Sequence, residues 1–566
     1  MFGQAVAGRI GPTLLRETGM RAGIAASLSG LLLLLTSCNA GEGRAPLQQP
    51  SAAGDAAPQR GGVFQMIGIR ALVHLDPWYQ QPTQNATFYL NGGVYDQLVD
   101  YDFRPDEDHR FTNKVVPELA EAWELRDKVV YTFSLRRNVK WHDGQPFTAR
   151  DVKWSYEFVA DSANKVAGGA PLKAIESISA LDDHTVQIKL HEPDVDFLNQ
   201  LTNQTILPKH VHDRGGSFET VAVGTGPFKV ESLDPNAGVV YTASATYWKP
   251  GMPYVDKFKI LPTADEAGRT AAFFAGLNDV LKAGAKPQAE VIVANNKEAR
   301  LSPFFQQANV EMTLKLNRPP FNDLRVRPAM HLAVDRQAII GTLTTGDGLM
   351  NPPALNAIYR SWALQPAEFE QMPGWRTPKD QDRTRAKQLL AEAGYGQGLS
   401  FTAKVDRSNP NWPAVAEVIS AQLRQIGVEA KLQPMESTVY SKDILQGDYD
   451  AFVAGGSTTP ASWFTKLHSR GPENTMPLRD PELDRLIEAQ AQEFDEAKRA
   501  EKIREMQRLL LRQAYLIPTV TFPGYLLVQP WVNGFVDNRG ANVSNPDWSQ
   551  LWLDVARAPT NRLRRE

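Results

Sequence analysis

Hydrophobic and polar residues alternate with a period of two in two segments of the first half of the chain. In residues 182–193, Val186, Ile188 and Leu190 fall on one face after an Asp-Asp turn signal. Residues 129–141 alternate in the same way. Because successive side chains of a strand point to opposite faces of a sheet, both segments are predicted to be half-buried strands.

Apolar residues at helical spacing, with capping residues in front of them, predict helices between and after these strands. Thr148 and Asp151 stand at capping-box spacing before one such helix. Asp382 and Asp480 are the predicted N-caps of two more, and Asp480 is followed by a proline at the first helical position. Residues 495–513 place apolar side chains on one face of a long amphipathic helix. The chain therefore mixes strands and helices.

The N-terminal part of the chain has the order of residues that is typical of an export signal. Residues 23–35 are apolar or small, follow an arginine, and are too few to span a bilayer comfortably. The run leads to Cys38, the single cysteine of the chain, in the sequence Leu-Thr-Ser-Cys, which resembles a bacterial lipobox. Residues 1–38 are therefore predicted to be a lipoprotein signal peptide with lipidation at Cys38, and translation could start at the first methionine or at Met20.

The segment that follows the cysteine, residues 39–60, is rich in Ala, Gly, Pro and Gln and is predicted to be a flexible tether. Folding is expected to begin near Gly61. The remaining chain, about 500 residues, exceeds what one hydrophobic core usually organises, so two or three lobes are expected. Because no second run of 18 apolar residues follows, the mature protein is expected to be soluble apart from its lipid.

Composition and motifs argue against several classes of protein. The chain has 61 basic and 64 acidic residues and a net charge of −3, which provides no field suited to nucleic acid. Nine scattered histidines offer no metal-ligand spacing, so no metal or cofactor is predicted. The sequence lacks the HExxH, GxxxxGK[ST] and GxSxG motifs, and one SxxK, from Ser162 to Lys165, has no KTG partner. The chain is therefore predicted to bind a ligand without catalysing a reaction.

Two polar clusters are predicted to be structural. His142 and Asp143 are adjacent on a turn, and such neighbours rarely face one another. Trp141 is expected to pack against this turn, and Gly144 to supply an unusual backbone angle. The second cluster is expected to make ion pairs that orient a helix, and it consists of Arg325, Arg327, Asp335 and Arg336.

Several segments together resemble the family 5 solute-binding proteins of bacterial ABC importers, the oligopeptide- and dipeptide-binding type. Residues 116–159, from VPELAEAW to WHDGQPFTARDVKWSYEFV, are similar to the signature segment of this family almost throughout. The other similar blocks follow in family order and are 224–230 (GTGPFKV), 247–260, 319–340 (PPFNDLRVRPAMHLAVDRQAII), 386–395 and 422–432. The resemblance covers residues 61–555.

The resemblance implies an α/β, two-lobed fold like that of periplasmic binding proteins, with an extra subdomain and a hinge between the lobes. The inserted subdomain would comprise residues 98–205 and lobe II residues 316–515. The chain would cross between the lobes near Asn317 and near Pro518. Residues 276–280, GLNDV, depart from the Gly-Glu-Ile-Asp type of sequence that is usual in the family. The parts of lobe I would be 61–97, 206–315 and 516–557, followed by a basic C-terminal tail, 558–566.

In peptide-binding relatives the ligand lies between the lobes as an added strand, held by backbone hydrogen bonds from one segment of each lobe. The similarity places the lobe I segment at residues 76–85 and the lobe II segment at residues 455–464. The ligand-binding residues that it implies are Trp78, Tyr79, Gln81, Pro82 and Thr83 in the first segment and Gly455, Gly456, Ser457, Thr458 and Trp463 in the second.

The lobe II segment lacks the acidic residue that peptide binders generally place there to pair with the ammonium group of the ligand. Three classes of ligand therefore stay open. One is a peptide whose amine is bound by another residue, and a second is a metal complex or haem. The third is a neutral or anionic solute, such as an oligosaccharide, an opine-like conjugate or a blocked peptide, bound by hydroxyl groups and by aromatic rings from Trp78, Tyr79, Trp412 and Trp463.

The resemblance further implies an exported, monomeric binding lipoprotein that closes around a peptide or peptide-sized solute and then docks on an ABC permease in the membrane. Closure is driven only by the higher affinity of the ligand for the closed form. The lipid on Cys38 would hold the protein at the periplasmic or extracellular face of the membrane. A lipoprotein that senses a peptide instead of importing it is the alternative.

Overall fold

The computed structural model describes the folded part of the chain from residue 57 onward, with short gaps. The described residues are 57–68, 72, 74–78, 90, 93–102, 114–164, 166, 169–262, 265–305, 309–357, 359, 361–456, 459–535 and 547–563. The predicted signal peptide, Cys38 and most of the predicted tether lie outside them. No helix within these ranges is both long enough and apolar enough to cross a membrane.

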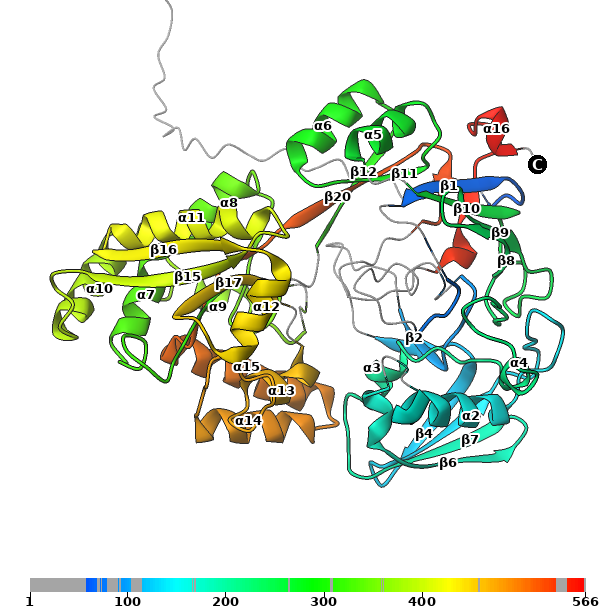
Figure 1. The fold of residues 1–566 in the computed structure, drawn as a ribbon, viewed down its shortest axis with the longest axis horizontal. Helices are drawn as coiled ribbons and strands as arrows, with labels where there is room; N and C mark the ends of the chain where they lie inside the picture. The colour runs from blue at the N-terminus through cyan, green and yellow to red at the C-terminus, as the bar shows by residue number, and fades with distance from the viewer. Residues whose placement is uncertain are drawn as a thin grey trace, which may run out of the picture. The chain divides into compact units, whose positions relative to one another are not determined.

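The two main sheets of lobe I have four and three strands (Figure 1). Phe64 and Phe258 from the larger sheet pack with Trp548 in the core, where the rings of Phe258 and Trp548 lie 4.6 Å apart. The larger sheet has the order β1 (Val63–Gly68), β10 (Lys257–Pro262), β9 (Gly238–Ala243) and β8 (Phe228–Asp234). The smaller has the order β11 (Val280–Ala283), β20 (Pro523–Val528) and β12 (Arg300–Phe305), with α5 (Glu266–Phe274) and α6 (Lys286–Asn295) beside it.

The inserted subdomain is a four-stranded antiparallel sheet covered by one helix. Val186, Ile188 and Leu190 are buried on one face, and Thr148 with Asp151 forms the capping box of the helix, so both predictions are confirmed. The elements are β4 (Ala120–Arg126), β5 (Val130–Leu135), β7 (Thr185–Leu190) and β6 (Ile175–Asp182) in sheet order, then α2 (Ala149–Ala160), α3 (Phe197–Leu201) and the pair β2 (Val99–Tyr101) with β3 (Val115–Pro117). α4 (Lys209–Asp213), in the segment after the subdomain, contacts α2.

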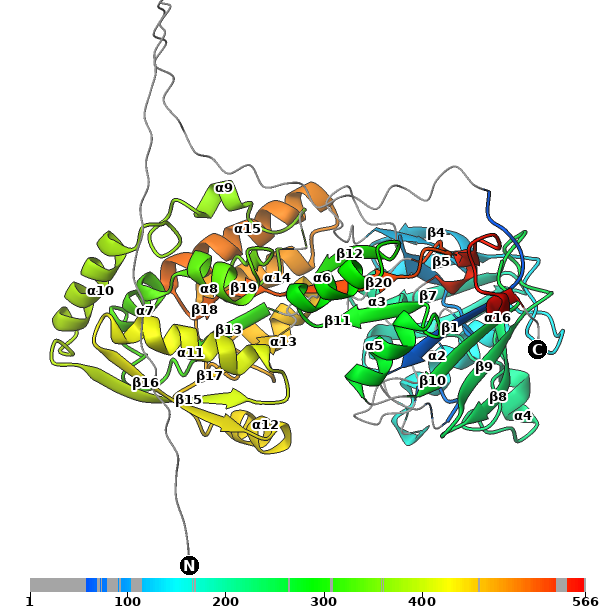
Figure 2. The ribbon, with the colours of Figure 1, turned by 90° about the horizontal axis from the view of Figure 1, so that it is seen from above.

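Lobe II is built on a five-stranded mixed sheet with helices packed against it (Figure 2). Its strands are, in sheet order, β16 (Val428–Met435), β15 (Leu399–Asp406), β17 (Ala451–Gly456), β13 (Asn309–Leu314) and β18 (Leu516–Pro518). Its helices are α7 (Val326–Ala333), α8 (Arg336–Leu343), α9 (Pro366–Phe369), α10 (Asp380–Glu392), α11 (Asn411–Arg424), α12 (Ser437–Gln446), α13 (Trp463–Leu467), α14 (Pro481–Ala491) and α15 (Glu496–Gln513).

Of the two N-caps predicted in lobe II, Asp480 is confirmed and Asp382 is wrong. Asp480 accepts hydrogen bonds from the first turn of α14, and α15 buries its apolar face, as predicted. Asp382 is not the cap of α10, because that helix begins at Asp380 with Lys379 at the N-cap position. The carboxylate of Asp382 is instead fully buried and ion-paired, which a periodicity argument does not reveal.

The chain crosses between the lobes at places that differ from the predicted ones. β12 belongs to lobe I and ends at Phe305, whereas β13 pairs with β17 and β18 in lobe II from Asn309 onward. The predicted boundary at 316 is therefore too late, because β13 is bonded into the lobe II sheet. The return crossing lies between β19 (Val520–Thr521), which pairs with β14 (Leu349–Met350), and β20. Residues 516–521 thus belong to the sheets of lobe II.

The end of the described chain packs on lobe I and does not form a free tail. The short helix α16 (Thr560–Leu563) buries Arg562, whose guanidinium lies 3.3 Å from the carboxylate of Asp279. The same carboxylate accepts hydrogen bonds from the backbone N–H of Gln65 and from the indole of Trp531. Residues 558–563 are therefore structural, and the GLNDV segment holds lobe I together through Asp279. The C-terminal strands β21 (Val532–Asn533) and β22 (Trp552–Leu553) pair nearby.

Candidate functional site

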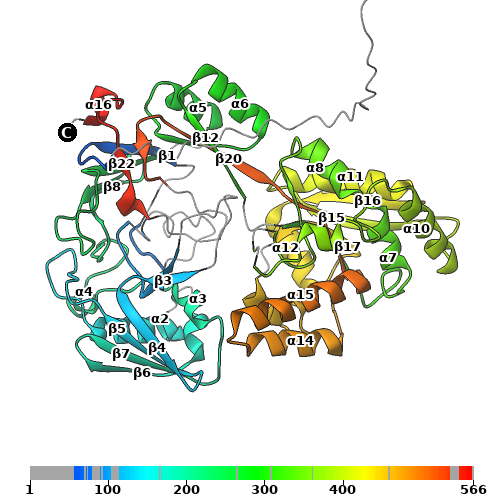
Figure 3. The ribbon, with the colours of Figure 1, turned by 180° about the vertical axis from the view of Figure 1, so that it is seen from behind.

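The C-terminal half of β17 has a neighbouring strand on only one side. β17 lies beside β15 in the sheet of lobe II (Figure 3). Its parallel pairing with β15 stops at Val453, whereas its antiparallel pairing with β13 continues to Gly456. Within the described residues, positions 454–456 thus have no strand partner on the β15 side. An extended chain can add to such a side of a sheet through main-chain hydrogen bonds.

A glycine and a tryptophan meet at this end of β17. A Cβ atom added at Gly455 would lie 2.6 Å from the indole nitrogen of Trp412, which stands at the start of α11. Trp412 is half-buried and packs against the lobe II core. Any side chain at position 455 would therefore have to displace the indole ring. The structure brings together two residues, Gly455 and Trp412, that the sequence placed at the ligand.

The two other predicted site residues with described side chains lie in the protein core. Trp463 is fully buried, and its indole N–H donates a hydrogen bond to the carbonyl oxygen of Ala354 at 3.0 Å. Trp78 is 9% exposed and packs in the lobe I core. Neither ring offers an open face in this structure, so their contact with a ligand stays a prediction. The remaining predicted residues, Tyr79, Gln81, Pro82, Thr83, Ser457 and Thr458, lie outside the described residues.

Two polar residues that the sequence reasoning missed lie on β13, next to β17. Asn309 faces Gly456 and Glu311 faces Ala454 across the ladder. Asn309 is 1% exposed, and neither its amide oxygen nor its amide nitrogen has a hydrogen-bond partner. Oε2 of Glu311 is buried without a partner as well. The alternation in NVEMTL, polar then apolar, was the signal that could have marked them.

Burial raises the pKa of Glu311 to about 7, and the positive charge of Lys466 opposes this shift. Lys466 lies on α13. The phenol oxygen of Tyr440, from α12, is also buried and unpartnered, and the charge of Glu311 is among the groups that raise its pKa. A carboxyl group, an amide and a phenol are therefore buried near one end of the lobe II sheet with unused hydrogen-bonding capacity.

A buried ion pair joins the inserted subdomain to lobe II. The guanidinium of Arg499 on α15 lies 2.7 Å from the carboxylate of Asp196, and both side chains are less than a tenth exposed. Arg499 is held in place by the side-chain oxygen of Gln490 at 3.1 Å. The ammonium group of Lys128 also lies over the ring of Phe494, 5.3 Å from its centroid. These contacts connect the inserted subdomain to lobe II through residues that are far in sequence from the two places where the chain crosses between the lobes.

The turn with adjacent His142 and Asp143 is structural, as predicted. The ring of His142 is hydrogen-bonded to the backbone of Gly224 and Gly226, and burial lowers its pKa to about 4. Asp143 instead pairs with His210 at 2.8 Å. Trp141 is fully buried and Gly144 has a φ of +89°. In the part of the chain that the structure describes, no group of three or more His, Cys, Asp or Glu could hold a metal ion.

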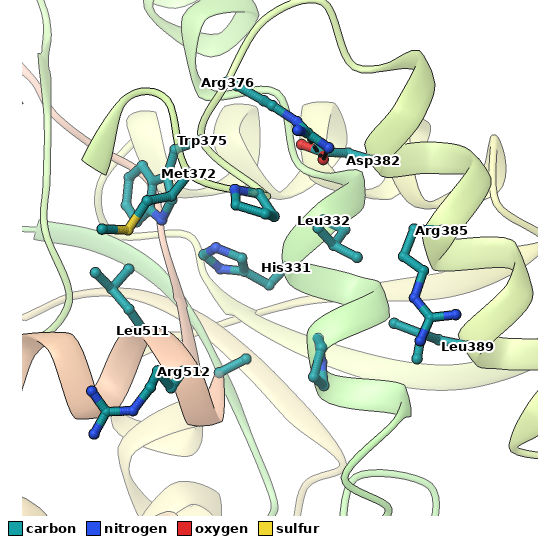
Figure 4. A pocket seen from close by; sticks show the side chains of 13 residues that line it. His331, Leu332, Met372, Trp375, Arg376, Asp382, Arg385, Leu389, Leu511 and Arg512 are labelled. Carbon is teal, nitrogen blue, oxygen red and sulfur yellow. Dashed lines mark hydrogen bonds and ion pairs between the residues drawn. The ribbon is translucent and has the colours of Figure 1, made fainter. Parts of the chain in front are cut away.

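Lobe II also contains a cavity of about 450 Å³ between α7, α10 and α15 (Figure 4). Two of its charged side chains are paired: Asp382 binds Arg376, and Arg385 binds Glu392. No residue of β13 or β17 lines it. The cavity is therefore separate from the end of the sheet described above. It is lined by Pro328, His331, Leu332, Met372, Pro373, Trp375, Arg376, Asp382, Arg385, Leu389, Leu511, Arg512 and Ala514.

Comparison with known proteins places the chain in a family. Residues 114–473 match the family model of bacterial extracellular solute-binding proteins, family 5 Middle. The periplasmic oligopeptide-binding protein OppA of Salmonella typhimurium is 26% identical over 457 residues, which cover 74% of this chain and 81% of OppA. Heme-binding protein A of Haemophilus influenzae is 28% identical over 487 residues, covering 79% of this chain and 84% of that protein.

A solved structure shares the fold. The open, unliganded form of MppA, a periplasmic murein tripeptide binding protein, superimposes with a TM-score of 0.74 at 21% identity, covering 88% of this chain and 98% of that structure. The family consists of binding components of ABC importers, which are not enzymes, and its members act outside the cytoplasm. The lobes, the ordered sequence blocks and these matches agree, and the chain belongs to family 5 of the bacterial extracellular solute-binding proteins.

Proposed function

We propose that this protein captures a peptide or peptide-sized solute and delivers it to an ABC permease. The observation that carries the proposal is the end of β17, where residues 454–456 have a strand on one side only. A peptide added there would be bound through its main chain, so that many side-chain sequences would be accepted. Relatives named for oligopeptide, dipeptide and murein peptide binding support this class of ligand.

The experiment that tests the proposal measures the melting temperature of the full chain in mild detergent, with and without ligand. Tryptophan fluorescence reports the unfolding. A ligand that binds only the folded state raises the melting temperature by mass action. Alanine peptides of two to five residues are expected to raise it, and the Gly455→Ala variant is expected to lose this response because its Cβ displaces Trp412. Gly341→Ala is the matched control, since no atom lies within 4 Å of its added Cβ.

Oligosaccharides, blocked peptides, opine-like conjugates and haemin serve as the other ligands of the same screen. Haemin is included because one relative is named a heme-binding protein. Stabilisation by one of these, with no response to any free peptide, would contradict the peptide proposal. The described residues give no observation that favours a sensing role over import.

Closure of the lobes around the ligand is expected to involve the ion pair between Arg499 and Asp196. The Asp196→Asn variant is expected to bind peptide about tenfold more weakly, mainly through faster release, because a charge-assisted contact between the two parts is lost. Stopped-flow release of a fluorescent peptide measures this effect. Asp183→Asn, which breaks an exposed pair with Arg150 on the same subdomain, is the control and should leave release unchanged. Equal release rates in wild type and Asp196→Asn would contradict a role for the pair in closure.

The proposal includes a lipid anchor on Cys38 and a monomeric mature protein. Cells supplied with labelled palmitate are expected to incorporate the label into the wild-type protein and not into Cys38→Ser, because the thiol is the attachment point in a lipobox. The label in the immunoprecipitated protein measures this, and equal labelling of the two would exclude Cys38. Several acyl chains on one residue hold a protein at a membrane far better than one chain does.

A further inference from the structure

Asn309 and Glu311 share one face of the lobe II sheet. They are two residues apart on β13, so their side chains point to the same side, whereas Val310, Met312 and Leu314 point into the hydrophobic core. Across the ladder, the same side of β17 carries Ala454 and Gly456. These two residues have a methyl group or no side chain, and Ala454 packs against the apolar cluster that contains Tyr440.

This face carries more unused hydrogen-bonding groups than a protein core normally tolerates. Both amide atoms of Asn309, Oε2 of Glu311 and the phenol oxygen of Tyr440 are buried and have no partner. More than nine in ten buried polar groups in proteins are paired, and each unpaired one costs about 1–3 kcal/mol. A ligand bound at this end of the sheet would explain these unpaired groups, because it would supply their missing hydrogen-bond partners.

The chemistry of these groups selects the ligand group. A carboxylate with a free oxygen accepts hydrogen bonds and pairs with a cation, and an amide both donates to and accepts from a peptide unit. The N-terminus of a peptide offers this combination, an ammonium group followed by a peptide group. The charged and titratable groups that face Glu311 are Lys466 from α13 and Tyr440 from α12. Since the segment after β17 has no acid, Glu311, which faces Ala454 across the ladder, is a carboxylate available at that end.

We propose that Glu311 binds the α-ammonium group of a peptide ligand at the end of β17, and that Asn309 binds the first peptide group. This inference rests on the proposed peptide-binding function and names the residue that replaces the acid missing from residues 455–464. The chain would then prefer peptides with a free N-terminus over the same peptides with a blocked one.

Isothermal titration of the full chain in mild detergent with tri-alanine and with N-acetyl-tri-alanine tests the inference. The wild type is expected to bind the free peptide at least tenfold more tightly. Glu311→Gln is expected to weaken binding of the free peptide by about 10- to 100-fold, the range for a hydrogen bond to a charged group, and to leave the acetylated peptide within twofold. Glu429→Gln, at an exposed position of the edge strand β16 in the same sheet, should change neither affinity.

The outcomes separate this inference from the proposed function. If the wild type binds neither these peptides nor longer ones, the peptide function fails and the role of Glu311 fails with it. If the wild type binds both peptides equally, or if Glu311→Gln keeps the preference for the free amine, only the role of Glu311 is overturned. The comparison of free and acetylated peptide on the wild type needs no variant. It therefore tests the preference for a free amine even if Glu311→Gln does not fold.

Discussion

Replacing Asp382 by alanine is expected to lower the free energy of unfolding by about 3–5 kcal/mol, the usual cost of removing one partner from a buried ion pair. Its carboxylate is fully buried and accepts hydrogen bonds from the backbone N–H of Gly374, at 2.8 Å, and from Lys379, at 3.1 Å. Arg376 approaches the other oxygen at 2.8 Å. Without the carboxylate, the 2% exposed ammonium group of Lys379 would be buried without its anion. Urea denaturation of variant and wild type measures the difference.

The loss caused by Asp382→Ala is expected to depend on pH. Burial and the charge of Arg336 together lower the pKa of Lys379 to about 8, although Asp382 opposes both. Without Asp382 the pKa of Lys379 falls further, so the lysine in the folded variant loses its proton below pH 8, and the penalty for an unpaired charge shrinks as the pH rises toward about 8. The control is Asp380→Ala, an exposed residue of the same first turn, with an expected change below about 1 kcal/mol. Equal losses for the two variants would contradict the special role of Asp382.

Replacing Lys249 by methionine is expected to destabilise the protein by about 3–5 kcal/mol at pH 7 and above, because it leaves several buried carboxylates without their cation. The ammonium group lies 2.7 Å from Glu118 and 3.9 Å from Asp547. Asp96, which accepts hydrogen bonds from Trp248 and Thr225, is also near enough to raise the pKa of Lys249. Burial alone disfavours the charge on Lys249, but these acids more than offset it and raise its pKa.

The direction of the pH dependence follows from the carboxyl groups. Burial raises the pKa of Glu118 to about 7 even though Lys249 pulls it down, and removal of Lys249 can only raise it further. An acid whose pKa is higher in the folded than in the unfolded state favours folding at low pH, and this contribution is lost as the pH rises. The deficit of Lys249→Met should therefore be small near pH 4.5, grow as the pH rises through about 7 and be complete only at higher pH. Thermal unfolding across this range measures it.

The control for this variant is Lys189→Met, which breaks an exposed pair with Glu176 on the subdomain sheet. Exposed pairs contribute about 0–1 kcal/mol, so this variant should stay close to the wild type at every pH. If the loss of stability in Lys249→Met instead grew toward low pH, the lysine would not act by compensating the charge of these carboxylates.

The local signals in the sequence predicted many elements correctly because they depend on neighbours in the chain. Thr148 with Asp151, and Asp480 with the proline after it, act at helix starts as their spacing indicated. Asp382 has the same residue type before a similar apolar pattern, yet it lies inside the helix. Its place is set by Arg376 and Lys379, whose positions depend on packing and not on helical period.

The second polar cluster shows the same limit. Arg325 pairs with Asp323, and Asp335 caps α8. Arg336, in contrast, is buried and donates to the carbonyl oxygens of Pro518, Val334 and Gly374, while its guanidinium lies 4.0 Å from the ring of Trp375. Ion pairs were expected for all four residues. The carbonyl partners of Arg336 come from distant segments, so no spacing in the sequence indicates them.

The sequence by itself determined the family, the α/β character and most helix starts, because capping, alternation and ordered motif blocks are written in adjacent residues. The tertiary structure decided where the chain crosses between the lobes, since β13 joins the lobe II sheet only through its pairing with β17 and β18. It also decided which polar residues lie together at the end of that sheet. Asn309 and Glu311 come next to Gly456 and Ala454 through a ladder between segments far apart in the chain, and long-range pairing of this kind leaves no local signal.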